Sequence, residues 1–338
     1  MTDLASIARD LVAPNKGILA ADESFPTIEK RFKSINIESS EENRRAYRDM
    51  LFGTDGLEEF ISGVILFDET IRQSSSDGAS FAEGLNKKGI VPGIKVDKGA
   101  KDLALFPGEQ VTEGLDGLRE RLSEYYDLGA RFTKWRAVIT IGEGLPTNFC
   151  LHANCHALAR FAALSQEAGL VPIVEPEVLM DGDHSIEACY DATKSTLEAL
   201  FMQLNLHRVA LEGTLLKTNM VLSGKDAADQ ASVEEVANRT VACLGETVPE
   251  EIPGVVFLSG GQSDELATAH LNAMNKIEHG PWELSFSYGR ALQAPSLKAW
   301  KGETSNVDAG RRALYHRAKL NGAARSGSYS EEMENEAA

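Results

Sequence analysis

Eight short apolar segments recur along the chain with helical stretches between most of them, and this pattern limits the possible folds more than any other feature. The segments are continuous apolar runs rather than alternations of apolar and polar residues, as expected for parallel strands covered on both faces. Each segment is therefore predicted to be a buried strand. The predicted strands are Gly17–Asp22, Gly63–Asp68, Ile90–Asp97, Arg131–Ile141, Leu170–Glu175, Arg208–Lys217, Val255–Gly260 and Leu284–Tyr288.

The stretches between these strands have the spacing of amphipathic helices. Residues 150, 153, 157, 161, 164 and 168 lie three or four positions apart, on one helix face. Residues 184–205 and 232–245 are similar, and Ser232 with Glu235 has the pattern of a capping box. Strands that alternate with helices predict an α/β fold, a closed (β/α)8 TIM barrel. A doubly wound sheet is the alternative, but no G-x-G-x-x-G motif follows the first strand.

The length of 338 residues fits one large α/β barrel or two average domains. The chain has no internal repeat of 20–50 residues and no low-complexity linker that would divide it. The last fourteen residues, RSGSYSEEMENEAA, carry four glutamates and one arginine. We therefore predict a single barrel domain over residues 1–324 and a short acidic tail over residues 325–338.

The net charge of −17 argues against an extended nucleic-acid surface, because phosphate-backbone binding needs clustered lysine and arginine. A small phosphorylated ligand remains compatible with it, since a local basic pocket can lie within an acidic protein. The first residues include acids and no long apolar run, unlike a signal peptide, and no stretch approaches the ~20 apolar residues of a membrane span. Four scattered cysteines suggest buried thiols in helices rather than disulfides. We expect a cytoplasmic protein without nucleic-acid or membrane partners.

Charged and small polar residues gather where the predicted strands end, the face at which barrel enzymes carry their chemistry. Any one of them could be a structural ion pair, but burying three lysines and several carboxylates in one place is costly without a function. These residues are Asp22-Glu23-Ser24, Asp68-Glu69, Lys95, Asp97, Lys134-Trp135-Arg136, Glu175, Glu177, Lys217, Ser259-Gly260-Gly261 and Ser287-Tyr288-Gly289-Arg290.

Lys217 is the candidate nucleophile, because it is flanked by Leu215-Leu216 and Thr218-Asn219 rather than by other charges. Burial disfavours an ammonium group, lowers its pKa and makes the amine nucleophilic near neutral pH. By itself, the residue is better interpreted as a strand-end lysine whose amine reaches water. If Lys134 lies close by, repulsion between the two ammonium groups lowers the amine pKa further.

Two further features point to a phosphate. Ser259-Gly260-Gly261 has the small residues that let backbone N–H groups approach an anion, although a Gly-Gly after a strand is more often only a turn. Arg290 could grip a phosphate with its planar guanidinium. Together with Lys217, these features predict Schiff-base chemistry on a phosphorylated carbonyl compound, with no metal or other cofactor.

A zinc site is a weaker interpretation of Cys150, His152, Cys155 and His156. The two histidines share a helix face, but HxxxH lacks the glutamate of a zincin, and Cys150 faces elsewhere. We predict a helix that merely contains these residues.

Seven motifs, in order from about residue 14 to residue 320, resemble those of class I fructose-1,6-bisphosphate aldolases. They are ILAADES, PGIKVDKG, KWR, PIVEPEVLMDGDH, LEGTLLKTNMV, FLSGGQS and LSFSYGRALQ. The resemblance implies reversible, metal-independent aldol cleavage of fructose 1,6-bisphosphate to dihydroxyacetone phosphate and glyceraldehyde 3-phosphate, in glycolysis and gluconeogenesis. It also implies a homo-oligomer, since relatives are commonly homotetramers.

The resemblance assigns roles to the motif residues. Lys217 would form a Schiff base with C2 of the ketose, and Glu175 and Asp22 would be the main acid/base carboxylates. The other implied site residues are Lys134, Arg136 and Glu177 beside the amine and the substrate, Lys95 near the substrate, Ser259, Gly260, Gly261 and Arg290 at the C1 phosphate, and Ser24 and Lys30 towards the C6 phosphate.

The chain departs from the family pattern at three places. Thr218 follows the lysine where the family usually has proline, and Phe25-Pro26-Thr27 replaces small residues after AADES. The second change leaves open how the C6 phosphate is held, and with it the preference for the bisphosphate over fructose 1-phosphate. Many members end in a tyrosine that exchanges the C3 proton of the enamine. Here the chain ends Glu336-Ala337-Ala338, and we expect a group other than Tyr329 to move that proton.

Two rival functions fit part of the pattern. A transaldolase-like transferase would use the same Schiff-base barrel on another phosphorylated sugar, and an assay for free trioses separates the two. A scaffold protein that has kept only the fold would not need an activated amine, so the combination of Lys217, Glu175, Asp22 and Lys134 argues against it.

Overall fold

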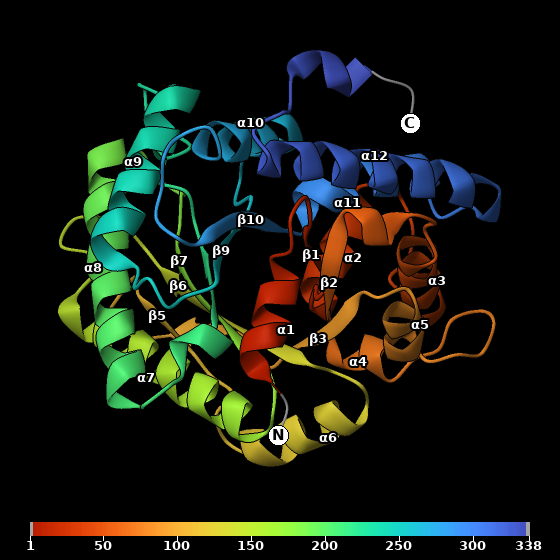
Figure 1. The fold of residues 1–338 in the computed structure, drawn as a ribbon, viewed down its shortest axis with the longest axis horizontal. Coiled ribbons are helices and arrows are strands. Elements are labelled where there is room, and N and C mark those ends of the chain that lie inside the picture. Colours follow the sequence, from red (N-terminus) through yellow and green to blue (C-terminus); the bar gives the residue numbers. More distant parts are fainter. Residues whose placement is uncertain (1–2, 336–338) are drawn as a thin grey trace.

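The computed structural model describes residues 3–335, and a closed barrel of eight parallel strands forms its centre (Figure 1). The strands follow one another around the barrel in the order β1-β10-β9-β8-β7-β6-β3-β2. This confirms the predicted TIM barrel. Its strands are β1 (Gly17–Ala20), β2 (Ile61–Leu66), β3 (Val91–Lys95), β6 (Phe132–Ile139), β7 (Val171–Val178), β8 (Leu215–Thr218), β9 (Gly254–Phe257) and β10 (Glu283–Tyr288).

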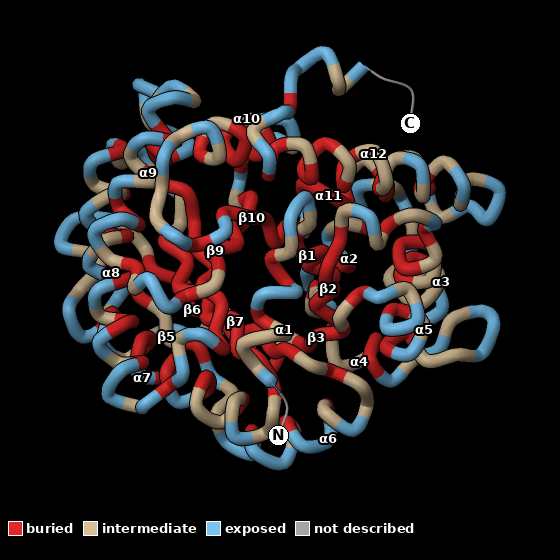
Figure 2. The backbone as a smooth tube through the Cα atoms, in the orientation of Figure 1, coloured by how far each residue is buried: buried red, intermediate tan, exposed pale blue. Residues whose placement is uncertain are grey.

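Helices surround the barrel, and the buried strands lie inside them (Figure 2). Among the described residues, no helix is long and apolar enough to cross a membrane. The α-helices are α1 (Leu4–Leu11), α2 (Phe25–Lys33), α3 (Glu41–Phe52), α4 (Asp68–Ile71), α5 (Phe81–Lys87), α6 (Leu118–Asp127), α7 (Asn148–Glu167), α8 (Ile186–Leu206), α9 (Val233–Thr247), α10 (Asp264–Met274), α11 (Arg290–Trp300) and α12 (Val307–Arg325). Short 3-10 helices cover Leu57–Glu59, Leu211–Gly213, Thr304–Asn306 and Glu331–Asn335.

The three helices predicted from apolar spacing are confirmed as α7, α8 and α9. Each begins at a residue whose hydroxyl accepts a backbone hydrogen bond from the first turn, which satisfies an otherwise unpaired N–H. Ser232 accepts from the Glu235 N–H at 3.2 Å, as the capping pattern predicted. All four cysteines are free, buried and located in these helices, as expected.

The predicted strand Arg208–Lys217 is wrong over its first half, since β8 begins only at Leu215. Arg208 has a positive φ of 56°, and Leu211–Gly213 forms a 3-10 helix instead. The side chain of Gln166 exchanges hydrogen bonds with the backbone N–H and carbonyl of Ala210, at 2.9 and 2.8 Å. The Gln166 side chain thus makes the backbone hydrogen bonds that a neighbouring strand would otherwise make with this apolar segment. The antiparallel hairpin of β4 (Ala100–Asp102) and β5 (Gln110–Thr112) was not predicted, because both strands are short and largely polar.

Strand alternation explains why charges stand at the barrel mouth. Side chains two residues apart point to the same face of a strand. Phe132, Ile173 and Leu215 point into the barrel and belong to its buried interior cluster. Two residues further along the same strands stand Lys134, Glu175 and Lys217. The apolar layer therefore closes the barrel below the charged layer, and a Cβ at Gly63 or Gly93 would crowd the ring of Phe132.

The chain beyond α12 folds back against the barrel's outer helices. Arg325, the first residue of the predicted tail, ends α12 and donates to the backbone carbonyl of Val12 at 3.1 Å. Tyr329 is buried, and its hydroxyl donates to Glu334 at 2.8 Å. Glu334 also pairs with Arg317 of α12 at 2.6 Å. Ordered packing thus continues past the predicted boundary, while Glu336-Ala337-Ala338 lie outside the described residues.

Candidate active site

A cavity of about 850 Å³ opens at the carboxyl ends of the barrel strands, where the sequence placed the chemistry. All eight barrel strands or their carboxyl ends contribute charged or polar side chains to its wall. They include Asp22 after β1, Lys95 of β3, Lys134 of β6, Glu175 of β7, Lys217 of β8 and Ser259 after β9.

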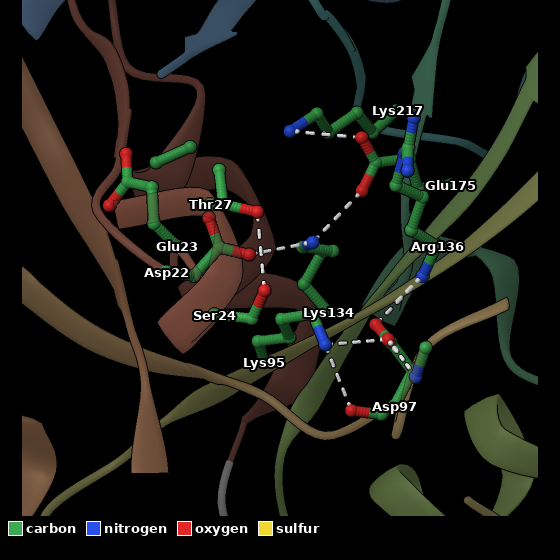
Figure 3. A network of polar contacts seen from close by, with 12 residues as sticks. Asp22, Glu23, Ser24, Thr27, Lys95, Asp97, Lys134, Arg136, Glu175 and Lys217 are labelled. Atoms are coloured by element: carbon green, nitrogen blue, oxygen red, sulfur yellow. Dashed lines mark hydrogen bonds and ion pairs between the residues drawn. The ribbon is translucent and has the colours of Figure 1, made fainter. Parts of the chain in front are cut away.

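Four of these side chains form one chain of alternating charge across the cavity floor (Figure 3). The Lys217 Nζ lies 3.1 Å from one oxygen of Glu175, and the other oxygen of Glu175 lies 3.2 Å from the Lys134 Nζ. Lys134 in turn contacts Asp22 at 2.7 Å. Lys217 is 4% exposed, so its amine does not reach bulk water in the way of a snorkelling surface lysine. The structure therefore brings together the four residues that were predicted to do the chemistry.

Burial and neighbouring charges set the protonation of this chain. Burial by itself would raise the pKa values of Asp22 and Glu175, but Lys134 and Lys217 outweigh it and lower both. Burial would also lower the pKa of Lys134, but Asp22 and Glu175 raise it above its ordinary value. At neutral pH the carboxylates are charged and Lys134 is protonated. Direct repulsion between the two lysines was expected, but Glu175 lies between their amines.

A second set of ion pairs lines the same cavity further from Lys217. Lys95 contacts the Asp97 carboxylate at 2.6 Å and its backbone carbonyl at 2.9 Å. The other Asp97 oxygen accepts from the backbone N–H of Arg136 at 3.2 Å, and Arg136 pairs with Glu177. The sequence identified Asp97 only as an acid at a strand end. In the structure its carboxylate contacts both the Lys95 amine and the backbone of β6, so it holds them together. Its position two residues after Lys95, within the predicted strand Ile90–Asp97, was the available signal.

The residues predicted for the C1 phosphate divide into two groups. Ser259 and Gly260 line the cavity. Gly261 is not among the lining residues; its φ of +72° makes the turn before α10. Arg290 is also outside the lining, because its guanidinium donates to the backbone carbonyl of Gln262 and lies 3.7 Å from Asp264.

Of the two residues predicted for the C6 phosphate, Ser24 is the N-cap of α2, and Lys30 lies on α2 and faces away from the cavity. Ser24 and Thr27 line the cavity, and their hydroxyls are 3.2 Å apart. Lys30 is exposed and is not a lining residue, whereas Arg31 is. Helix geometry explains this difference, since positions 24, 27 and 31 share a face and position 30 does not. Arg31 could have been found from that spacing.

The unexpected Phe25 anchors the start of α2 to its neighbours. Its ring meets the edge of Phe67 with a centroid distance of 5.3 Å, and the Arg44 guanidinium lies 4.8 Å from its centroid. Arg44 is held by two hydrogen bonds to Glu69, at 2.6 and 2.7 Å. Phe25 therefore stabilises the cavity wall without lining the cavity.

Comparison with known proteins agrees with this geometry. The family model described as "Glycolytic: Fructose-bisphosphate aldolase class-I" matches residues 3–338. The chain belongs to the class I fructose-bisphosphate aldolases. The probable fructose-bisphosphate aldolase class 1 of Xanthomonas campestris pv. campestris is 61% identical over 327 residues, covering 96% of this chain and 98% of that one. The cytosolic fructose-bisphosphate aldolase 4 of Arabidopsis thaliana is 52% identical over 97% of this chain and 84% of its own.

A solved aldolase structure has the same fold. The Plasmodium falciparum fructose-bisphosphate aldolase, crystallised with TRAP and a small-molecule inhibitor, superimposes with a TM-score of 0.95 at 50% identity. The match covers 97% of this chain and 95% of that one. The barrel fold and the family membership are therefore in agreement.

Thr218, another departure from the aldolase family pattern, belongs to a buried hydrogen-bond network. Thr218 is fully buried, and its hydroxyl donates to Asn219 at 3.3 Å. Asn219 also accepts from the Val178 N–H at 3.0 Å and donates to Thr193 at 3.0 Å, so this network ties β8 to β7 and α8. Tyr329 contacts Glu334 and is not among the residues that line the active-site cavity.

The residues considered for zinc do not come together in this aldolase. His152 and His156 are exposed, whereas Cys150 and Cys155 are buried, so α7 presents the two pairs on different faces. Among residues 3–335, no group of three or more His, Cys, Asp or Glu side chains is arranged to hold a metal ion.

Proposed function

We propose that the protein cleaves fructose 1,6-bisphosphate reversibly into dihydroxyacetone phosphate and glyceraldehyde 3-phosphate through a Schiff base on Lys217, without a metal ion. The observation that carries this proposal is the buried Lys217 amine, 3.1 Å from Glu175 at the cavity floor. A buried primary amine with a carboxylate in contact is suited to attack a carbonyl carbon and to exchange protons with it.

The contacts support a role for each member of the charged chain. Lys217 attacks C2 of the ketose, and Glu175 transfers the proton that allows the carbinolamine to lose water. The protonated imine then draws electrons from the C3–C4 bond while a carboxylate, Glu175 or Asp22, accepts the C4 hydroxyl proton. Lys134 touches both carboxylates, at 3.2 and 2.7 Å, and stabilises their negative charge as protons move. Because the iminium is the electron sink, a metal ion is not required.

Phosphate recognition is divided between two regions of the cavity. Ser259 and Gly260 follow β9, the neighbour of β8 that carries Lys217, and we assign them to the C1 phosphate. Arg290 joins them when its guanidinium leaves the Gln262 carbonyl. Lys95 lies on the other side of Lys134 from Lys217 (Figure 3) and lines the cavity with Ser24 and Thr27, and we assign this region to the far end of the substrate.

Borohydride reduction tests the Schiff base directly. With dihydroxyacetone phosphate present, reduction should fix a substrate-derived adduct on the peptide that contains Lys217, as read by mass mapping. Adding EDTA should leave both the adduct and the turnover unchanged. An adduct on another lysine, or turnover that EDTA abolishes without an adduct, contradicts the mechanism.

We assign Arg31 of α2, rather than Lys30, to the C6 phosphate because Arg31 lines the cavity, and a matched pair of variants tests the assignment. Arg31→Met should raise KM for the bisphosphate about tenfold or more, because it removes a charged phosphate contact from the cavity wall. Lys30→Met should leave KM within about twofold, because the Lys30 side chain faces solvent. Steady-state kinetics with fructose 1,6-bisphosphate measure both KM values. If Lys30→Met raises KM and Arg31→Met does not, Lys30 is the phosphate ligand.

The expected context follows from family membership. We propose a homotetramer that acts in glycolysis and gluconeogenesis in the cytoplasm, with a phosphorylated sugar as its partner. Two Arabidopsis thaliana relatives named as cytosolic support the location. Light scattering on the purified chain would measure the assembly state.

A further inference from the structure

A second buried carboxylate, Glu23, stands next to Asp22 but takes no part in the charged chain around Lys217. Its side chain is 4% exposed and points away from Lys134, whereas Asp22 points toward that lysine (Figure 3). Glu23 accepts hydrogen bonds from Arg31, Arg48 and the side-chain amide of Gln293. These partners come from α2, α3 and α11, so Glu23 joins three helices to the end of β1.

Arg48 is a fixed partner of Glu23. Its side chain is 4% exposed, and it also donates to the Gln293 Oε1 at 3.4 Å. Gln293 is itself held, because its amide donates to the Ala20 carbonyl at 2.7 Å and its oxygen accepts from the Tyr47 hydroxyl at 3.1 Å. Buried groups with several partners have no alternative position that keeps their hydrogen bonds. Burial would raise the pKa of Glu23, but Arg31 and Arg48 lower it, so the carboxylate is charged at neutral pH.

Arg31 is a partner of a different kind, since its side chain is 23% exposed and has free space on two sides. It lines the active-site cavity and also a second cavity of about 380 Å³, whose wall includes Arg290 and Gln293. Its guanidinium lies beside Gly289, at the start of α11, where a Cβ would be 3.6 Å from its Nη2. The guanidinium can therefore move without displacing packed side chains.

The charges explain why two arginines surround one carboxylate. A buried carboxylate that loses its only cationic partner is strongly destabilised. With Arg48 in place, departure of Arg31 leaves one positive and one negative charge in contact. With both arginines present the cluster has an excess positive charge on the cavity wall, which favours an incoming anion.

We propose that Arg31 exchanges Glu23 for a phosphate of the substrate, and that Arg48 is the positioning residue that keeps Glu23 paired when it does. The inference rests on the proposed function, because it takes a phosphorylated sugar as the ligand. It assigns a role to Glu23, Arg48 and Gln293, none of which contacts the reacting atoms.

Binding of inorganic phosphate to the full-length protein, measured by calorimetry, tests this exchange without any turnover. Arg48→Met should weaken phosphate binding about tenfold or more, because Arg31 becomes the sole counter-charge of a buried carboxylate. Adding Glu23→Gln to that variant should restore binding to within about threefold of the original, since a neutral amide no longer retains Arg31. In an Arg31→Met background, Arg48→Met should change phosphate binding less than about twofold.

Two results overturn the proposal: unchanged phosphate binding in Arg48→Met, or an equal loss in the presence and absence of Arg31. Circular dichroism shows whether Arg48→Met folds. If it does not, Glu23→Gln alone decides, because releasing Arg31 should tighten phosphate binding several-fold and an unchanged Kd contradicts the exchange. Borohydride trapping on Lys217 in the unaltered protein reports on the proposed function separately, so failure of one idea is distinguishable from failure of the other.

Discussion

Lys217→Arg is expected to abolish sugar cleavage, lowering kcat by at least ~10⁴-fold, while the protein stays folded. A guanidinium keeps the positive charge that Glu175 contacts at 3.1 Å, but it cannot form an imine with C2 of the ketose. Most of the ion-pair network is therefore preserved, and only the nucleophile is lost. The variant should show neither turnover nor a borohydride adduct, and its thermal unfolding should remain cooperative.

Lys101→Arg is the matched control, because Lys101 is exposed on β4. The same chemical change at that position should leave kcat and KM unaltered. If Lys217→Arg retains more than a few per cent of the original turnover, the amine is not the nucleophile and the mechanism is wrong.

Glu175→Gln is expected to lower kcat by about 10²- to 10⁴-fold, the range typical of an acid/base residue. The amide has the same shape but cannot accept a proton, and it leaves the amines of Lys217 and Lys134 without the charge between them. Removing one partner of a buried pair costs about 3–5 kcal/mol of folding stability, so the melting temperature should also fall. Glu246→Gln removes an exposed partner of Lys194 and should leave the melting temperature nearly unchanged.

Acid denaturation gives Glu175→Gln a second readout. The pKa of Glu175 is lowered in the folded protein, so its ionised form adds stability above the unfolded pKa. That stability is lost as the pH falls through the folded pKa. The variant lacks this term, and its stability should decline less steeply in acid than that of the original chain. If the stability of both proteins falls equally steeply with pH, Lys134 and Lys217 do not lower the pKa of Glu175 in the folded protein.

Much of the barrel and its charged floor was predictable because both depend on local periodicity. Continuous apolar runs identify buried parallel strands, and the period of two places Lys134 and Glu175 on the inward face above Phe132 and Ile173. The same reasoning failed at Arg208–Leu211, where three apolar residues resemble a strand. The partner that decides the local structure there is Gln166, more than forty residues away in the chain.

Contacts between residues far apart in the chain cannot be predicted from local sequence patterns. Arg48 and Gln293 are 245 residues apart, and nothing in either local sequence links them to Glu23. The direction in which a long side chain points cannot be predicted from the sequence either. Arg290 follows β10 as predicted, yet its guanidinium binds the Gln262 carbonyl rather than facing the cavity. The side of a helix on which a residue lies is partly predictable. Once the bounds of α2 are known, the helical spacing distinguishes Arg31 from Lys30.

In the proposed mechanism, the closed floor of the barrel and the covalent intermediate on Lys217 together impose an order on product release. Phe132 fills the interior below Lys134, against Gly63 and Gly93, so the cavity opens at the strand ends. In the proposed mechanism, dihydroxyacetone phosphate remains attached to Lys217 as an enamine after the C3–C4 bond breaks, whereas glyceraldehyde 3-phosphate is free. Both trioses share that exit, and the free aldehyde must clear it before water can complete hydrolysis of the imine. Inhibition by the two products should accordingly differ in type, with dihydroxyacetone phosphate competing directly with the sugar.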